Sequence, residues 1–176
     1  MTYNSSNLLK ASPFIADSAL SFKLGTRAVF NHGTNEDLFV EAVYIEADAT
    51  LTAGQVCELP LISGTDAFVV DAPLTTTNAA TLADAQYERF AACVPLADLV
   101  DGEYGWAAVK GIIPIKLAAS CEGQQLLFLT ATAGVLDYTD TDYEVEGVFS
   151  TATITTAATT NCIAYHDLFV RRDAAV

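Results

Sequence analysis

A turn followed by an aromatic strand, at residues 101–111 (Asp-Gly-Glu-Tyr-Gly-Trp-Ala-Ala-Val-Lys-Gly), constrains the fold of this chain more than any other stretch. Gly102 and Gly105 predict a tight turn, because glycine adopts positive φ at low cost. Tyr104 and Trp106 then alternate with small residues, as they would in a strand. Trp106 is the only tryptophan. A ring that buries about 200 Å² is expected at the centre of a β-core.

Short strand–turn units continue from residue 25 to the end of the chain. Residues 37–46 predict a central strand with apolar residues on both faces, and Pro114 predicts an edge or a bulge because proline donates no ladder hydrogen bond. A hairpin turn is expected at 31–35, and the Thr-, Ala- and Asn-rich stretch 71–87 is interpreted as a loop that could include a short helix at 82–87. Strands are predicted at 26–30, 37–46, 56–61, 67–70, 90–96, 104–111, 112–117, 126–130, 143–150 and 162–171, whereas 151–160 is a strand or a loop. About 8–10 short strands with frequent turns predict an all-β fold, an antiparallel β-sandwich or a small β-barrel.

Residues 1–26 differ from the repeating strand pattern and form a predicted extended N-terminal arm, with a β-rich body at 27–176. Pro13 interrupts any long helix in the arm. The spaced apolar residues of the arm require a surface to bury against. The alternative is an ordinary frayed terminus.

The net charge of −14 is placed unevenly. Residues 28–170 carry three basic residues (Arg89, Lys110 and Lys116) against 20 acidic residues. Such a body repels a phosphate backbone, which argues against nucleic acid as a partner. The acidic surface either keeps the protein soluble or receives the basic ends of a neighbouring subunit. No apolar run has the ~18 residues of a membrane span, and the first residues do not show a signal-peptide pattern.

Chemistry-bearing motifs do not stand out in the sequence, and we expect neither an enzyme nor a bound cofactor or metal. Cys57, Cys93, Cys121 and Cys162 lack zinc-site spacing and are expected to be buried free thiols. His32 is predicted to be solvated in a turn. His166 is placed in the last strand beside Asp167, which would point to the opposite face.

The acidic run at 137–146 is the best metal candidate. Asp140, Asp142, Glu144 and Glu146 fall on one face of a strand, and calcium prefers carboxylate oxygens. No glycine has the register of a calcium loop, so a solvated acidic face is the favoured interpretation.

Aromatic residues offer a second possible binding surface. Tyr104, Trp106, Tyr138 and Tyr143 could form a platform for a glycan, although packing in a core or an interface is favoured. The alternative function is therefore a carbohydrate-binding or host-adhesion module.

Four stretches carry a resemblance to a known family: 24–27 (Leu-Gly-Thr-Arg), 51–56 (Leu-Thr-Ala-Gly-Gln-Val), 101–111 and 129–137 (Leu-Thr-Ala-Thr-Ala-Gly-Val-Leu-Asp). In this order they resemble the capsid decoration (cement) proteins of tailed bacteriophages. The resemblance covers roughly residues 24–150 and carries no catalytic residues. It implies a β-rich protein that assembles in the host bacterial cytoplasm, sits on the capsid exterior of the virion, and binds the major capsid protein and its own copies, often as a homotrimer.

The arm and the basic ends, which lie outside the stretch that carries the resemblance, supply the expected contacts in this interpretation. Candidate contacts with the capsid or with another subunit are Lys10, Phe14, Ile15, Leu20, Phe22, Lys23, Arg171 and Arg172. We expect a structural role, in shaping the turn and the strand, for Gly102, Tyr104, Gly105 and Trp106.

Overall fold

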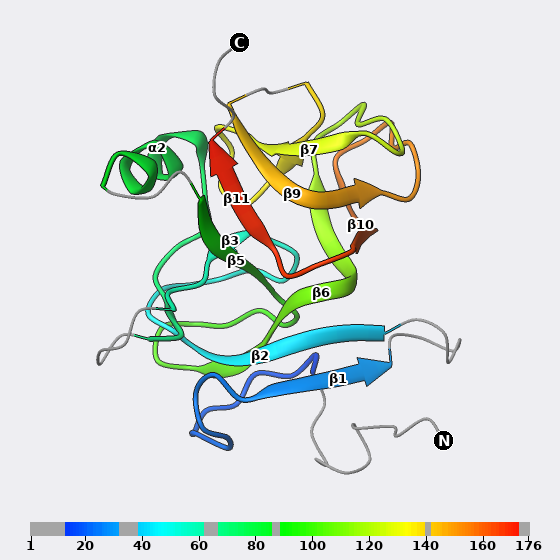
Figure 1. Ribbon diagram of the computed structural model, residues 1–176. Helices are drawn as coiled ribbons and strands as arrows, with labels where there is room; N and C mark the ends of the chain where they lie inside the picture. Colours follow the sequence, from blue (N-terminus) through cyan, green and yellow to red (C-terminus); the bar gives the residue numbers. More distant parts are fainter. Residues whose placement is uncertain (1–12, 32–38, 62–66, 86–88, 140–141, 173–176) are drawn as a thin grey trace.

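The computed structural model describes residues 13–31, 39–61, 67–85, 89–139 and 142–172 (Figure 1). Within these ranges the chain is nearly all β, with a single helix, which confirms the predicted fold class. The elements are β1 (Arg27–Asn31), β2 (Phe39–Ala47), β3 (Cys57–Glu58), β4 (Val69–Val70), α2 (Thr76–Ala85), β5 (Arg89–Pro95), β6 (Tyr104–Leu117), β7 (Leu126–Leu129), β8 (Leu136–Asp137), β9 (Tyr143–Ser150), β10 (Ala158–Ala164) and β11 (Phe169–Arg172).

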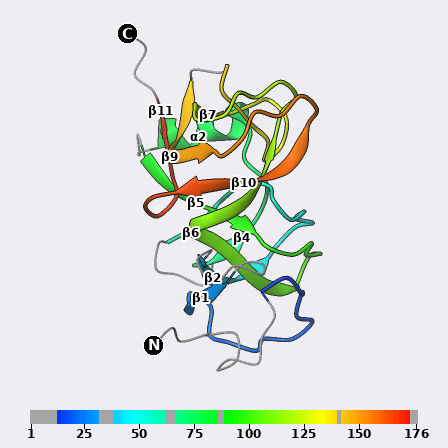
Figure 2. The ribbon, with the colours of Figure 1, turned by 90° about the vertical axis from the view of Figure 1, so that its right-hand side faces the viewer.

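Strand β6 organises the sheet, because it pairs with β2, β5, β8 and β10. Strand β10 also pairs with β9, β9 with β11, and β11 with β5. The pairings therefore close a circuit of β5, β6, β10, β9 and β11, which is the arrangement of a small barrel. Strands β1 and β2 extend the sheet at one end of the molecule, and β7 and β9 lie at the other end (Figures 1 and 2). The pairings are antiparallel except for the short pairs β2–β4 and β6–β8.

Trp106 lies at the centre of a cluster of aromatic rings in the core, with 1% of its surface exposed. The centroids of the Phe30, Tyr44 and Phe22 rings lie 5.0, 5.1 and 5.3 Å from its own. These tilted and edge-on geometries are the favoured ones for aromatic pairs. The prediction that Trp106 centres a β-core is confirmed.

The two glycines of the opening turn have different roles. Gly102 has a φ of +80° and donates its N–H to the carbonyl of Ala47 at 2.8 Å, as the predicted turn requires. Gly105 lies inside β6 without positive φ, so its predicted turn conformation is wrong. A Cβ atom at Gly105 would come within 2.8 Å of the Leu99 side chain. Close packing therefore explains the glycine at position 105.

Two predictions about β2 and β6 are confirmed. Strand β2 is largely buried, as the apolar residues on both of its faces indicated. Pro114 lies opposite Asn161 of β10. Two residues later, the N–H of Lys116 points away from β10 and donates to the carbonyl of Gly54. The nitrogen of Pro114 points the same way, because amide direction repeats every two residues. The missing donor therefore falls on the edge of β6 that faces away from β10.

Helix α2 begins earlier than the predicted helix at 82–87. The hydroxyl of Thr75 accepts the N–H of Asn78, and the Asn78 side chain accepts the N–H of Thr75. This reciprocal pair caps the first turn, so the helix begins at Thr76 within the Thr-rich stretch interpreted as a loop. The predicted hairpin turn at 31–35 lies mostly outside the described residues.

The predicted last strand at 162–171 is wrong as one element, since it consists of β10, a turn at 165–168, and β11. Strand β10 pairs with β6 and β9, whereas β11 pairs with β5 and β9. Because of this turn, the segments before and after it pair with different strands. The strands predicted at 56–61 and 67–70 shrink to two residues each, β3 and β4.

The described part of the predicted arm, residues 13–26, lies on the body. Asp17 exchanges two backbone hydrogen bonds with Tyr104, of 2.7 and 2.9 Å. Phe22 packs against the core cluster that contains Trp106. The apolar residues of the arm were expected to need a surface to bury against. For Phe22, the body of the same chain provides that surface.

Candidate functional site

The candidate contact residues differ in how far they are exposed. Phe14, Ile15 and Leu20 have exposed fractions of 44%, 63% and 58%. Phe22, by contrast, faces Tyr44 and Trp106 and is taken up by its own core. Lys23 is exposed, and Lys10 lies outside the described residues.

The basic residues at the end of β11 also have different surroundings. Arg171 is bound to Glu144 at 2.9 Å and to Glu146 at 3.5 Å. The positive charge of Arg171 is therefore paired with carboxylates of the neighbouring strand β9. Arg172 is exposed at the end of β11.

The acidic run at 137–146 is not a solvated face where β9 is described, so that interpretation is wrong for Glu144 and Glu146. Glu144 is only 9% exposed, and Glu146 also binds Arg89 at 2.6 Å. The Arg89 guanidinium lies 4.0 Å from the centre of the Phe169 ring. Strand pairing brings these side chains together because β9, β11 and β5 are neighbours. Asp140 lies outside the described residues.

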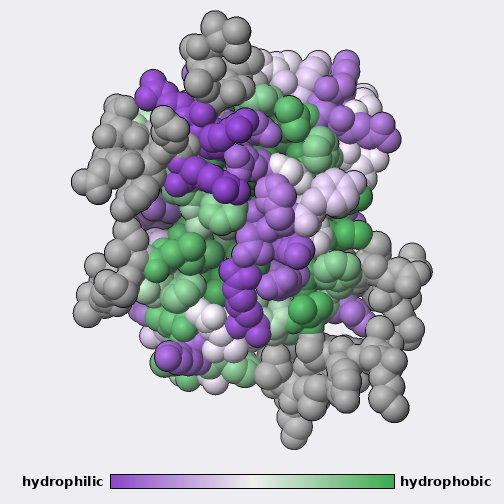
Figure 3. Space-filling view, in the orientation of Figure 1, coloured by the Kyte–Doolittle hydropathy of each residue, from purple (hydrophilic) through white to green (hydrophobic). Residues whose placement is uncertain are grey.

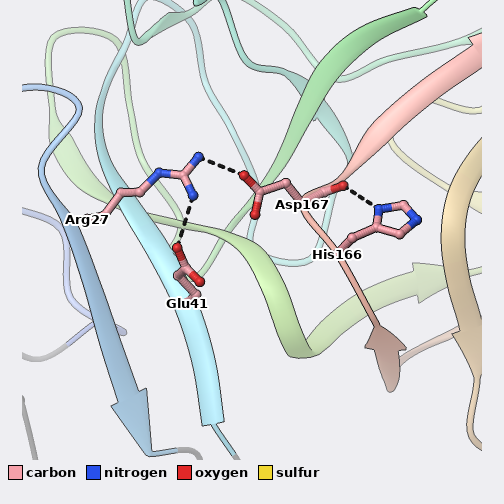
Figure 4. A network of polar contacts seen from close by, with 4 residues as sticks. All are labelled: Arg27, Glu41, His166 and Asp167. Atoms are coloured by element: carbon pink, nitrogen blue, oxygen red, sulfur yellow. Dashed lines mark hydrogen bonds and ion pairs between the residues drawn. The ribbon is translucent and has the colours of Figure 1, made fainter.

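Arg27 links β1 to the turn before β11 (Figure 4). Its guanidinium binds Glu41 and Asp167, each at 2.9 Å. The hydrogen bond to Asp167 is the main cause of a raised Arg27 pKa. Figure 3 shows a band of hydrophilic residues crossing this side of the molecule, where β11 and the preceding turn run toward β1 in Figure 1.

His166 lies in the turn between β10 and β11, so its predicted place in a strand is wrong. Its Nδ1 lies 2.8 Å from the carbonyl oxygen of Asp167. The Asp167 carboxylate instead faces Arg27. A general base requires an oriented partner that activates it, and the contacts of His166 with Asp167 do not provide the ring–carboxylate pair of such a base. His32 lies outside the described residues.

A cavity of about 260 Å³ lies beside α2. It is lined by the carboxylates of Glu58 and Asp71, by Asn78 and by apolar residues. Burial, and secondly the charge of Asp71, raises the pKa of Glu58. Within the described ranges, no group of three or more His, Cys, Asp or Glu side chains is arranged to hold a metal ion.

The four cysteines are buried free thiols, as predicted. Cys57 of β3 lies directly opposite Cys93 of β5. Burial raises the pKa of Cys57 and that of Cys162 to about 12, and raises that of Cys93 well above its usual value. Thiols with raised pKa values are poor nucleophiles at neutral pH, because the thiolate is the reactive form.

The aromatic residues considered as a glycan platform do not form one. Trp106 is 1% exposed and Tyr143 is 5% exposed. Tyr104 and Tyr138 are partly buried against the same core. Packing in a core or an interface was the favoured interpretation of these residues, and packing in the core is confirmed. Among the described tyrosines, the one most open to solvent is Tyr165, at 68%, and it was not identified from the sequence.

No helix in the described part of the chain is both long enough and apolar enough to cross a membrane. The sequence matches no family model, and no curated protein matches it.

Proposed function

We propose that this chain is a structural protein of a bacteriophage virion, a capsid decoration protein that binds the outer surface of the major capsid protein and copies of itself. The β-rich body and the resemblance of residues 24–150 to cement proteins support the proposal. Such a protein acts by adding contacts between capsid subunits, and its stable body serves to hold the contact residues in place.

The observation that carries the proposal is the exposed apolar segment at residues 14–20. Ile15 and Leu20 are among the most exposed large apolar side chains of the described residues. Asp17 lies between them and is fixed to Tyr104 by two backbone hydrogen bonds. A contact surface held in place before binding loses less conformational entropy when the partner arrives.

The acidic surface and the repeated geometry of a capsid are consistent with this function. A net charge of −14 keeps a densely covered particle soluble and directs this protein away from packaged DNA. Each contact can be modest when one protein binds several neighbours at once, because linked contacts raise the overall affinity.

Cosedimentation with phage heads tests the proposal. Purified protein is mixed with heads that lack it, and the fraction that pellets with the heads is measured over a range of protein concentrations. The double variant Ile15→Ser with Leu20→Ser should bind at least about tenfold more weakly, as loss of two apolar contact residues predicts. The matched control is Val100→Ser, which alters an apolar residue that is 54% exposed in a different loop.

Point variants are preferred to removal of the whole arm, because a deletion through residue 22 also removes Asp17 and Phe22 from the body. Mass spectrometry of purified virions provides an independent readout. Wild-type protein that neither pellets with heads nor occurs in virions would refute the proposed function. Equal binding by the double variant and the wild type would refute the role of residues 14–20.

A further inference from the structure

An apolar row crosses four adjacent strands on the outside of the barrel. Strand pairing places Leu126 of β7 beside Phe149 of β9, Phe149 beside Ile163 of β10, and Ile163 beside Ile112 of β6. Figure 2 shows β9, β10 and β6 in this arrangement. Side chains directly opposite one another in neighbouring strands share a face of the sheet, so the four form one row.

Burial shows that this row faces outward. On both sides of Ile163 in the chain, Cys162 and Ala164 are buried in the core. Ile113, next to Ile112, is buried as well. Alternating burial is the mark of a strand with one face in the core and the other at the surface. Leu126 remains 41% exposed.

Tyr165 extends the row, and we call these five residues the apolar face: Leu126, Phe149, Ile163, Ile112 and Tyr165. The Tyr165 ring packs edge-on against Phe149 with 5.9 Å between centroids, and 68% of the residue is exposed. A shallow groove of about 400 Å³ runs along this part of the sheet, between Gln124 and Tyr165. Contiguous apolar surface of this kind marks an interaction site more often than scattered exposed residues do.

The charges around the apolar face differ from those of the chain as a whole. The residues that line its groove carry no charge. On the outward side of the β6–β10 ladder, Thr159 and Lys116 lie opposite each other, two positions beyond Asn161 and Pro114. Lys116 is one of the three basic residues of the acidic stretch 28–170, and it forms no ion pair with a described residue. The flank of the apolar face along the β6–β10 ladder is therefore bordered by one uncharged and one basic residue.

We propose that the apolar face is the surface by which one copy of this chain binds another copy. Two molecules with a charge of −14 repel each other, so close approach favours a region without carboxylates. The apolar residues gain by leaving water, and Lys116 attracts the acidic surface of the neighbour. This inference rests on the part of the proposed function that concerns self-association, and it assigns that association to a surface distinct from the capsid-binding segment at 14–20.

Sedimentation equilibrium of the full-length protein without phage heads tests the assignment. The weight-average mass should rise above the monomer mass of 18.6 kDa as protein concentration increases. Tyr165→Glu should raise the dissociation constant at least about tenfold, because it places a charge among apolar contacts. Lys116→Glu should weaken association most at low salt, where charge attraction is strongest. The matched control Val100→Glu adds the same charge elsewhere on the surface and should leave association within about twofold.

Circular dichroism and thermal unfolding establish that each variant is folded. A wild-type protein that stays monomeric at every concentration overturns the proposal, as does equal loss of association in the Tyr165 and Val100 variants. Binding to a glycan array that disappears in Tyr165→Glu, with no self-association, would reassign the apolar face to carbohydrate and also overturn it. Decoration of heads by a protein that never self-associates counts against this inference alone. Self-association without decoration counts against capsid binding alone.

Discussion

The Tyr44 hydroxyl donates a 2.6 Å hydrogen bond to the carboxylate of Asp17, and this contact fixes the segment before β1 to the buried strand β2. Burial, followed by the Asp17 hydrogen bond, raises the pKa of Tyr44 to about 12. The same oxygen accepts the N–H of Ser21 at 3.3 Å. One buried side chain thus holds two points of the N-terminal segment against the body.

Tyr44→Phe should lower the free energy of unfolding by about 1–2 kcal/mol, because it removes a hydrogen bond to a charged group while keeping the ring. Urea unfolding followed by Trp106 fluorescence measures the loss. Because the folded-state pKa of Tyr44 is raised, its contribution is complete below about pH 10 and is lost as the pH rises toward about 12. The variant should therefore show a smaller alkaline decrease in stability, and an unchanged alkaline profile would contradict this account.

Trp106→Ala should cost about 3–5 kcal/mol of stability, since it empties the centre of the aromatic cluster. The exposed fraction of 1% places the ring in the core. Equilibrium unfolding monitored by circular dichroism gives the value without a tryptophan signal. A loss below about 1 kcal/mol together with impaired oligomerisation would instead indicate that the ring serves an interface.

The buried thiols should be unreactive in the folded protein. A thiol reagent at neutral pH should modify the four cysteines slowly in native protein and rapidly after unfolding in urea. Because burial raises the Cys57 pKa to about 12, the neutral thiol stabilises the fold at lower pH, and this contribution is lost as the pH rises from about 9 toward 12. Cys57→Ala should reduce this alkaline loss. Fast labelling of native protein would show that the thiols are accessible.

Glu58→Gln should stabilise the protein at neutral pH. The folded-state pKa of Glu58 is raised, chiefly by burial and then by Asp71, so the ionised carboxylate is less favourable in the folded protein than in the unfolded chain. Stability supported by the protonated form is lost as the pH rises through the folded pKa. The melting temperature of the variant should exceed that of the wild type near pH 7 and converge with it in acid. Asp71→Asn should shift the Glu58 titration, as observed by NMR, toward lower pH.

Local patterns predict much of this fold, and their failures have physical causes. The buried strand at Phe39–Ala47 and the strand at Tyr143–Ser150 follow from alternation and from the apolar residues they carry. Helix α2 was predicted too late in the chain, because Thr75 and Asn78 form a cap that a search for apolar periodicity does not detect. The division of residues 162–171 depends on which strands are nearby, and that information is not local.

The candidate contact residues also show that local sequence does not determine which side chains are buried. The exposure of Ile15 and Leu20 agrees with an apolar segment that needs a partner. Phe22 has the same local character, yet it is partly buried against Tyr44 and Trp106, which lie far away in the sequence. Arg171 likewise resembles a free basic end until β9 brings Glu144 beside it. The apolar face, which needs the pairing of four strands, has no signature in any single segment.

The connections of β6 have a consequence for synthesis on the ribosome. Its N-terminal half pairs with β2, which is made earlier, but its C-terminal half pairs with β10, which is among the last strands to emerge. The aliphatic residues Ile113 and Ile115 therefore stay without their final neighbours while the intervening chain is translated. Sheets built from such distant pairings fold slowly and expose aggregation-prone strands in the meantime. A nascent chain released before β10 would carry an open barrel, so premature termination should yield aggregates in place of a smaller folded domain.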